Sequence, residues 1–215
     1  MGSVGSSRSG VPEKDHELKK NGSIILLSMT GLATAASAQN FSLTLVPSVS
    51  TLDTFGGGLF TIDVYADADV GSHIAECAFG LQSDSFGVSG ITWTPAEWAE
   101  FNIDDGYAGN GNHNTVNFGQ IIIPGIRPPS TGSWLGQRVG SFVISTIEFN
   151  GVLEFELVER DTLSLRVYDE TQGVFYQNNA SNLYLQGFSI NAVIPAPSGA
   201  SVILVSGLLC SRRNR

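Results

Sequence analysis

Residues 142–158 read Phe-Val-Ile-Ser-Thr-Ile-Glu-Phe-Asn-Gly-Val-Leu-Glu-Phe-Glu-Leu-Val, with Asn150-Gly151 between two apolar runs. An Asn-Gly pair accepts the positive φ angles that a two-residue type I′ turn requires. A turn at this pair sets Ile144 opposite Leu157, so that the apolar side chains of both runs share one face. Turn chemistry and apolar pattern agree on one register, and the segment predicts a β-hairpin.

The same period of two appears upstream, between Phe60 and Val70. Apolar residues alternate there with polar ones, and Asp63, Asp67 and Asp69 fall on the polar positions. Because successive side chains of a strand point to opposite faces, this pattern predicts a strand with one buried face and one acidic face. A solvated face explains the three carboxylates better than half of a calcium site, which needs six or more oxygen ligands.

Short apolar runs between turn signals continue along residues 39–193. Further strands are predicted at Phe41–Val46, Ile74–Leu81, Val88–Thr92, Val116–Ile123, Leu163–Val167, Gly173–Gln177 and Leu183–Ile190. Helix is expected only as one turn at Ala96–Ala99. Many short strands at regular spacing predict an all-β domain, a two-sheet antiparallel β-sandwich of jelly-roll or similar type.

The charge of this middle region is strongly acidic. Between Gln39 and Val193 there are seventeen acidic residues, four arginines and no lysine, for a formal charge of −13. Such a surface repels phosphate backbones, which argues against nucleic acid as a partner. A solvated acidic face that keeps a secreted protein soluble is the simplest interpretation.

The N-terminal segment 1–38 has the order of a secretory signal. Lys19-Lys20 precede the short apolar run Ile24–Ala33, and the small residues Ala36 and Ala38 precede Gln39. Small residues at these two positions are what a signal peptidase reads. We expect a short signal helix, recognition by the secretion machinery, and cleavage between Ala38 and Gln39.

The C-terminal segment 194–215 differs from the domain that precedes it. Pro195 and Pro197 end the last strand, and a run of small and aliphatic residues follows over 199–210. The chain then closes with Arg212, Arg213 and Arg215. Positive charge resists translocation, so a hydrophobic helix here would anchor the chain in a membrane with the domain outside.

This tail resembles the PEP-CTERM sorting signal of exported bacterial proteins. The similar features are Pro195-Ala196-Pro197, where the family usually has Pro-Glu-Pro, the apolar segment, and the terminal arginines. The resemblance implies an exosortase-like protease as a partner and a cell-surface or extracellular location. It also implies an association with exopolysaccharide.

The middle domain resembles cohesin-like sandwiches of bacterial surface proteins. The similar stretches are Gly58–Ala66, Cys77–Leu81 and Gly140–Phe142. This resemblance implies a fold of two packed sheets and, as one alternative function, protein docking through a flat sheet face with an apolar patch. Fold alone does not establish function.

Aromatic residues suggest a sugar-binding surface. Trp98 and Trp134 occur in loop-like contexts. Together with Tyr107 they are candidates for a platform that stacks on sugar rings. Trp93 ends an apolar run and is expected in the core. Exposure of Trp98 and Trp134 on one face would favour a carbohydrate-binding module, and burial of both would count against it.

The segment 104–114 is the better calcium candidate. Its oxygen-bearing side chains come from Asp104, Asp105, Asn110 and Asn112, on a glycine-rich stretch that could wrap a cation. The spacing does not match an EF-hand, and an ordinary long loop is the simpler interpretation. Apart from this calcium candidate, no cofactor is expected.

The motifs of common enzyme classes are missing from the sequence. It contains no Gly-x-Ser-x-Gly elbow, no phosphate loop and no dinucleotide fingerprint. His73 and His113 lie in no metal-ligand motif, and Cys77 is expected as a buried, unreactive thiol. We therefore expect an exported, non-catalytic, structural or adhesive protein. The alternatives are a carbohydrate-binding module, a cohesin-type docking module and, ranked lowest, a glycoside hydrolase.

Overall fold

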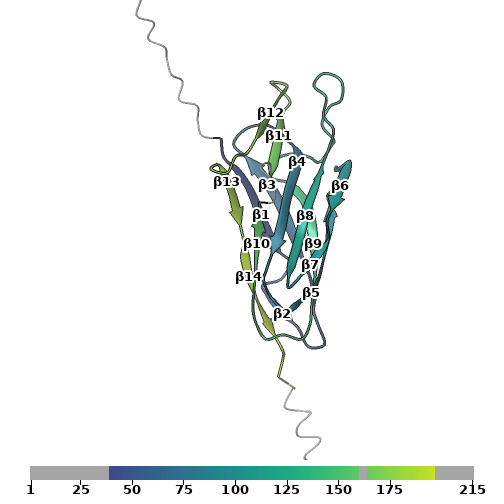
Figure 1. The fold of residues 1–215 in the computed structure, drawn as a ribbon. Helices are drawn as coiled ribbons and strands as arrows, with labels where there is room; N and C mark the ends of the chain where they lie inside the picture. The colour runs from purple at the N-terminus through teal and green to yellow at the C-terminus, as the bar shows by residue number, and fades with distance from the viewer. Residues whose placement is uncertain (1–38, 160–163, 197–215) are drawn as a thin grey trace, which may run out of the picture. The chain divides into compact units, whose positions relative to one another are not determined.

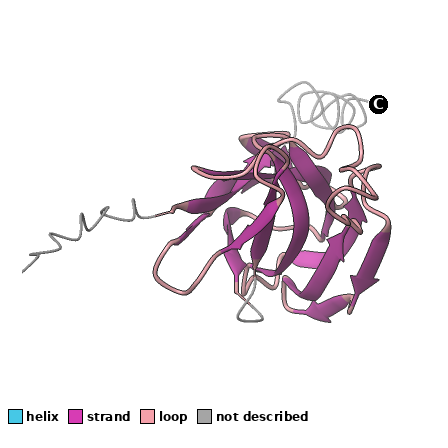
Figure 2. Cartoon of the chain, turned by 90° about the horizontal axis from the view of Figure 1, so that it is seen from above, coloured by secondary structure: helices cyan, strands magenta, loops and turns pink. Residues whose placement is uncertain are grey.

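A computed structural model describes residues 39–159 and 164–196, which form fourteen strands and no helix (Figures 1 and 2). Five strands form one sheet, in the spatial order β13 (Leu183–Gln186), β1 (Phe41–Pro47), β3 (Leu59–Ala68), β9 (Arg138–Thr146) and β5 (Val88–Pro95). The predicted all-β, two-sheet sandwich is confirmed.

The second sheet contains the other nine strands. Its main path runs through β12 (Val174–Gln177), β11 (Leu165–Asp169), β4 (His73–Gln82), β10 (Gly151–Val158), β14 (Phe188–Val193) and β2 (Thr51–Asp53). On the other side of β4 lies β8 (Asn112–Gly119), which pairs with β6 (Phe101–Asp104) and β7 (Tyr107–Gly109). The short strands β2, β6 and β7 were not predicted from the sequence.

The core lies between the two sheets, and β3 shows how the sequence builds it. Phe60, Ile62 and Val64 on its inner face are at most 4% exposed, while Asp63 on the outer face accepts a hydrogen bond from the Ser141 hydroxyl at 2.6 Å. The predicted alternation of this strand is confirmed. From the opposite sheet, Phe155 meets Phe60 edge to face with ring centroids 5.8 Å apart. Burial of such aromatic side chains is the main source of stability for a sandwich.

The predicted hairpin over residues 142–158 is wrong. β9 pairs with β3 and β5, whereas β10 pairs with β4 and β14 in the other sheet. Residues 147–150 therefore carry the chain across the sandwich. Gly151 is extended, with φ of 158°, and Asn150 does not have the positive φ that a type I′ turn requires. The apolar pattern placed each run on the core correctly, but two strands that face each other across a core show the same pattern as two paired strands.

Two pairings in this sandwich are parallel, and both involve the ends of the domain. β1 runs parallel to β13, and β2 runs parallel to β14. The segments 41–53 and 183–193 thus run side by side and pass from one sheet to the other together. As a result, the described chain starts at one end of the sandwich and leaves at the other (Figure 1).

Several predicted strand limits also change. β8 ends at Gly119, so residues 120–123 belong to a loop, and the strand predicted at Leu183–Ile190 is divided at Gly187. A Cβ atom on Gly187 would collide with the backbone carbonyl of Phe155, so the chain bends there with glycine. The helical turn predicted at Ala96–Ala99 is a single turn closed by the Ala99 amide, which donates to the Ala96 carbonyl at 3.0 Å.

Candidate functional site

The most elaborate surface lies where the described chain starts, on the long β8–β9 loop. We call residues 120–137 and 168–175 the aromatic end. Gln120 fixes the loop, because its buried side chain donates to the Ile74 carbonyl at 2.6 Å and accepts from the Ser130 amide at 2.6 Å. Farther along, the Ser133 carbonyl accepts from the Ile74 amide at 2.6 Å. The loop is thus bound to β4 at two points.

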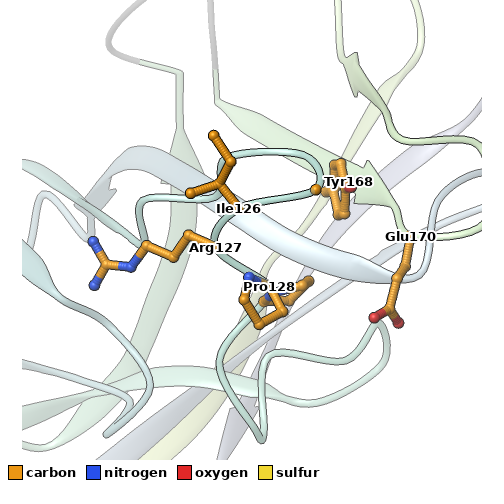
Figure 3. A pocket seen from close by; sticks show the side chains of 7 residues that line it. Ile126, Arg127, Pro128, Tyr168 and Glu170 are labelled. Atoms are coloured by element: carbon orange, nitrogen blue, oxygen red, sulfur yellow. The ribbon is translucent and has the colours of Figure 1, made fainter.

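Between these points the loop projects and borders a hollow of about 290 Å³ (Figure 3). The hollow is lined by Gly125, Ile126, Arg127, Pro128, Pro129, Tyr168 and Glu170. Ile126 at the tip is 80% exposed. The Arg127 guanidinium donates to Glu100 at 2.7 Å, and in Figure 3 it points away from Glu170. Glu170 is the one carboxylate among these lining residues, so the hollow does not hold the carboxylate pair of a glycosidase.

Trp134 lies beside this hollow and is half exposed. Its ring packs against His73 in a tilted arrangement, with centroids 4.0 Å apart and an interplanar angle of 37°. The Ser72 hydroxyl lies 2.9 Å from His73 Nδ1 and accepts from the Glu170 amide at 3.2 Å, which joins the stack to the hollow. Burial lowers the pKa of His73 from its ordinary value, and the nearby Glu170 carboxylate acts in the opposite direction. Trp134 is therefore a half-exposed ring packed on His73, which is linked through Ser72 to Glu170 of the hollow.

A second aromatic pair covers the outer face of β4 and β11. Tyr168 and Phe175 lie with ring centroids 4.9 Å apart, and the Arg166 guanidinium lies 4.3 Å from the Phe175 centroid. Together with Ala75 and Ile122 these rings form a small apolar cluster outside the main core. This layer explains why β4 is covered on both of its faces.

The other two predicted sugar-binding residues are placed elsewhere. Trp98 is 7% exposed and packs against Phe118 in the core, so the expectation that it lies open is wrong. Tyr107 is partly buried, and its hydroxyl donates to the Val88 carbonyl at 2.8 Å. The structure does not assemble these two side chains into a platform with Trp134. Trp93 is buried, as predicted.

Two of the four calcium candidates, Asp104 and Asn112, use a side-chain oxygen within the protein. Asp104 accepts from the Gly106 amide at 2.8 Å and lies 3.3 Å from His113 Nε2. Asn112 instead faces the β4–β5 loop, where it donates to Asp84 at 2.8 Å. Asn110 has a φ of 51° in a tight turn, and the Asp105 amide donates to the Thr115 carbonyl. These side chains do not converge, and residues 39–159 and 164–196 contain no group of three or more His, Cys, Asp or Glu suited to a metal ion.

The single cysteine among the described residues behaves as expected. Cys77 is fully buried, and burial, with Glu76 adding to the effect, raises the pKa of its thiol. A thiol held in its neutral form is a poor nucleophile. Both described histidines are buried too, so none of these three side chains is available to an external ligand.

The predicted export residues fall mostly outside the described part of the chain. This holds for Ala36 and Ala38, and for Pro197, Arg212, Arg213 and Arg215 in the tail. Gln39 is described, and its carbonyl accepts from Asn182 Nδ2 at 2.7 Å. Pro195 and Ala196 are exposed after the last strand. No helix within the described ranges has the length and apolar character needed to span a bilayer.

Comparison with known proteins identifies no family for this chain. No protein-family model and no curated protein matches the sequence. Among solved structures, the chain is similar to the seventh ScaB type I cohesin from Pseudobacteroides cellulosolvens, with 12% identity, a TM-score of 0.49, and coverage of 74% of this chain and 96% of that one. A cohesin module of a Clostridium perfringens family 33 glycoside hydrolase is 10% identical, with a TM-score of 0.45 and coverage of 73% of this chain and 99% of that one. A non-cellulosomal cohesin from the archaeon Archaeoglobus fulgidus is 8% identical, with a TM-score of 0.40 and coverage of 75% of this chain and 96% of that one.

These solved structures are of the class that the middle of the sequence resembles. At such identities and scores they carry no argument about what this chain binds. The assignment of an all-β sandwich comes from the strand pairings themselves.

Sequence reasoning missed the projecting loop of the aromatic end. Ile121, Ile122 and Ile123 extend the apolar run of β8 and were therefore predicted as strand. The useful signal was Pro124-Gly125 followed by Pro128-Pro129, because prolines cannot donate to a sheet ladder. Two of the three isoleucines, Ile121 and Ile123, are more than 40% exposed.

Proposed function

We propose that this chain is an exported, non-catalytic surface protein with a structural or adhesive role outside the cell. In this proposal a signal peptidase cleaves after Ala38. The sandwich is then held at the cell surface by the C-terminal tail, which an exosortase-like protease recognises. The medium in which it acts is the exopolysaccharide that the tail resemblance implies.

The observation that carries the proposal is where the sandwich starts and stops. Gln39, directly after the candidate cleavage site, is bound to the domain, because its carbonyl accepts from Asn182 Nδ2 at 2.7 Å. At the other end, the Val193 carbonyl accepts from the Thr54 amide at 3.0 Å, directly before the tail. All of the described strand pairings lie between these two residues. The two candidate sorting segments therefore flank the pairing that holds the domain together.

Export is tested by the N-terminus of the protein that cells release or display. We expect it to begin at Gln39, and we expect Ala38→Arg to leave the signal attached, because signal peptidase requires a small residue there. Glu76→Gln, a change inside the domain, is the matched control and should be processed normally. An intact Met1 on unaltered protein in the cytoplasm would contradict the proposal.

Anchoring is tested separately by changing the tail. Removal of residues 199–210 should move the protein from the membrane fraction to the medium, because the apolar run supplies the membrane affinity. Equal membrane association with and without this run would show that the tail is not the anchor.

Carbohydrate binding is the second candidate function, and Trp134 is the observation that favours it. A half-exposed indole held against His73, beside a hollow with a carboxylate, can stack on a sugar ring and bind its hydroxyls. We expect Trp134→Ala to abolish binding on a glycan array, while Phe86→Ala, a change to a more exposed aromatic at the other end, leaves it unchanged. The arrays should be run with and without calcium. Binding that survives Trp134→Ala would exclude this site.

A further inference from the structure

The end of the sandwich where the chain leaves carries a group of exposed apolar side chains. We call the loops 54–58, 83–87 and 147–150, with the strand residues next to them, the exit end. Phe86 is 80% exposed and Phe55 is 72% exposed. Three other large apolar side chains here are at least half exposed: Leu59, Ile147 and Val152. Exposed apolar residues scattered singly need no explanation, but a group of them at one end of a domain marks an interaction surface.

Hydrogen bonds join these loops into one surface. The Ile147 amide donates to the Gly87 carbonyl at 3.0 Å, which ties the third loop to the second. The Thr54 hydroxyl donates to the Phe149 carbonyl, which ties the first loop to the third. Within the first loop, the Phe55 amide donates to Asp53 at 2.9 Å. The two phenylalanines are thus presented by loops that hold one another.

The chain departs from this same surface. The Val193 carbonyl accepts from the Thr54 amide and lies 3.2 Å from the Thr54 hydroxyl, so the last strand ends beside the first loop. The apolar run of the tail starts at Gly199, a few residues after Ala196. An extended chain spans at most about 3.5 Å per residue, so the run begins within about 10 Å of Ala196. Whatever holds the tail must lie close to the exit end.

We propose that the exit end rests on the lipid bilayer in which the tail is anchored, with Phe55 and Phe86 entering its interfacial region. This inference depends on the proposed membrane anchoring of the tail. A tether this short makes contact between the loops and the lipid intramolecular, so a weak affinity of the loops for lipid is enough to hold them there. Apolar side chains at the level of the headgroups stabilise such contacts.

The charge of the exit end specifies the kind of lipid. Its exposed acidic residues are Asp53, Asp84, Glu148 and Glu154. Within loops 54–58, 83–87 and 147–150 there is no arginine or lysine to attract anionic headgroups. Docking is therefore driven by apolar contact and opposed by anionic lipid, the reverse of the usual polybasic membrane contact.

The test uses the chain purified from the membranes of exporting cells and placed in phosphatidylcholine vesicles with brominated acyl chains. Phe86→Trp places a fluorescent ring at the exit end, and Ile126→Trp places one at the opposite end at the same 80% exposure. We expect the emission added by Phe86→Trp to fall by about half or more, because brominated lipid quenches rings in the interface, and that of Ile126→Trp to stay unchanged. Replacing part of the lipid with phosphatidylglycerol should weaken the quenching.

Each contrary outcome has a distinct meaning. If both variants float with the vesicles but are quenched equally little, the exit end does not dock, while anchoring by the tail stands. If neither variant floats with the vesicles, both the docking and the proposed anchoring are wrong. If Phe86→Trp is shielded from lipid and also from aqueous iodide in a dimer seen by sedimentation, a second copy of the chain covers the surface and the proposal is overturned.

Discussion

The two ends of the sandwich are closed by loops of different chemistry. The exit end carries exposed phenylalanines and acidic residues. The aromatic end carries Trp134, two tilted ring pairs and a projecting loop. The three described arginines, Arg127, Arg138 and Arg166, lie in that loop or on strands near it. Since one set of strands connects both ends, the difference comes from the loops, which is where binding functions usually reside.

Both ends nevertheless use the same device for stability. Each has a buried polar side chain that joins separate segments, such as Thr54 at the exit end and Gln120 at the aromatic end. A buried side chain with all its hydrogen bonds made fixes loops that have little apolar contact of their own. The loops therefore differ in the side chains they expose and agree in how they are fixed to the strands.

The largest effect is expected from a change in the core that both ends share. Phe79 is fully buried and packs edge to face on Phe118 and Trp93. Phe79→Ala should lower the free energy of unfolding by about 3–5 kcal/mol, through lost burial and the cavity that remains. Denaturant unfolding of the chain measures this loss.

Labelling of Cys77 shows whether the two ends unfold together. In a Cys210→Ser background, the buried thiol should react with a thiol reagent only on global unfolding, and faster in Phe79→Ala. If one end kept its protection from hydrogen exchange after Cys77 had reacted, the ends would be independent units rather than two faces of one domain.

A smaller and local effect is expected from the two polar side chains. Gln120→Ala removes the hydrogen bonds to Ile74 and Ser130 and should cost about 1–3 kcal/mol. Hydrogen exchange should accelerate in residues 121–136 and not at the exit end. Thr54→Val, which keeps the shape of the side chain, should accelerate hydrogen exchange in the loops of the exit end and not in residues 121–136. Equal acceleration at both ends in either variant would refute separate control of the loops.

A pH effect near neutrality should distinguish the aromatic end. Burial lowers the pKa of His73, so the folded protein binds its proton less readily than the unfolded chain. The contribution of neutral His73 to the free energy of unfolding is therefore fully present above pH 6.5. It declines as the pH falls through 6.5 toward the lower folded pKa. Denaturation midpoints between pH 7.5 and 5.5 measure this decline. The decline in midpoint should be smaller in His73→Gln. An identical decline in that variant would show that another group causes the pH dependence.

The smallest effect concerns the exit end in acid. Hydrogen bonds from Asn112 and then Gln82 lower the pKa of Asp84 from its ordinary value of 3.8. The contribution of this exposed carboxylate is present above pH 3.8 and is lost as the pH falls through 3.8 toward the folded pKa. Asn112→Ala should move the titration of Asp84, followed by nuclear magnetic resonance, back toward 3.8. An unchanged titration would show that the hydrogen bond from Gln82 alone keeps the pKa of Asp84 lowered.

The strands β3 and β9–β10 mark how far the sequence predicts the fold. The alternation over Phe60–Val70 gives a strand and its buried face, and both are confirmed as far as Ala68, where β3 ends. The equally regular pattern of residues 142–158 gives two strands and their buried faces, but not their partners. A period of two records only which side of a strand avoids water, and the choice between pairing within a sheet and packing across the core depends on residues far along the chain.

The site residues show the same limit. Trp134 was predicted to be open and is half exposed, whereas Trp98 was predicted on the same reasoning and is buried. Loop-like composition around a tryptophan does not reveal whether the loop folds onto the core. The oxygens of Asp104 and Asn112 are close in sequence, yet the turn at Asn110 directs Asn112 toward Asp84 on another loop.

An acidic, all-β domain between two segments of different composition can be predicted from the sequence alone, because apolar period, glycine content and charge are local properties. Tertiary contacts alone place β9 and β10 in opposite sheets, make the terminal strands run parallel, and bring the loops of Phe55 and Phe86 to the end where the chain leaves. These features depend on contacts between residues distant in the chain, such as Thr54 with Phe149 and Val193, and no local pattern records such contacts.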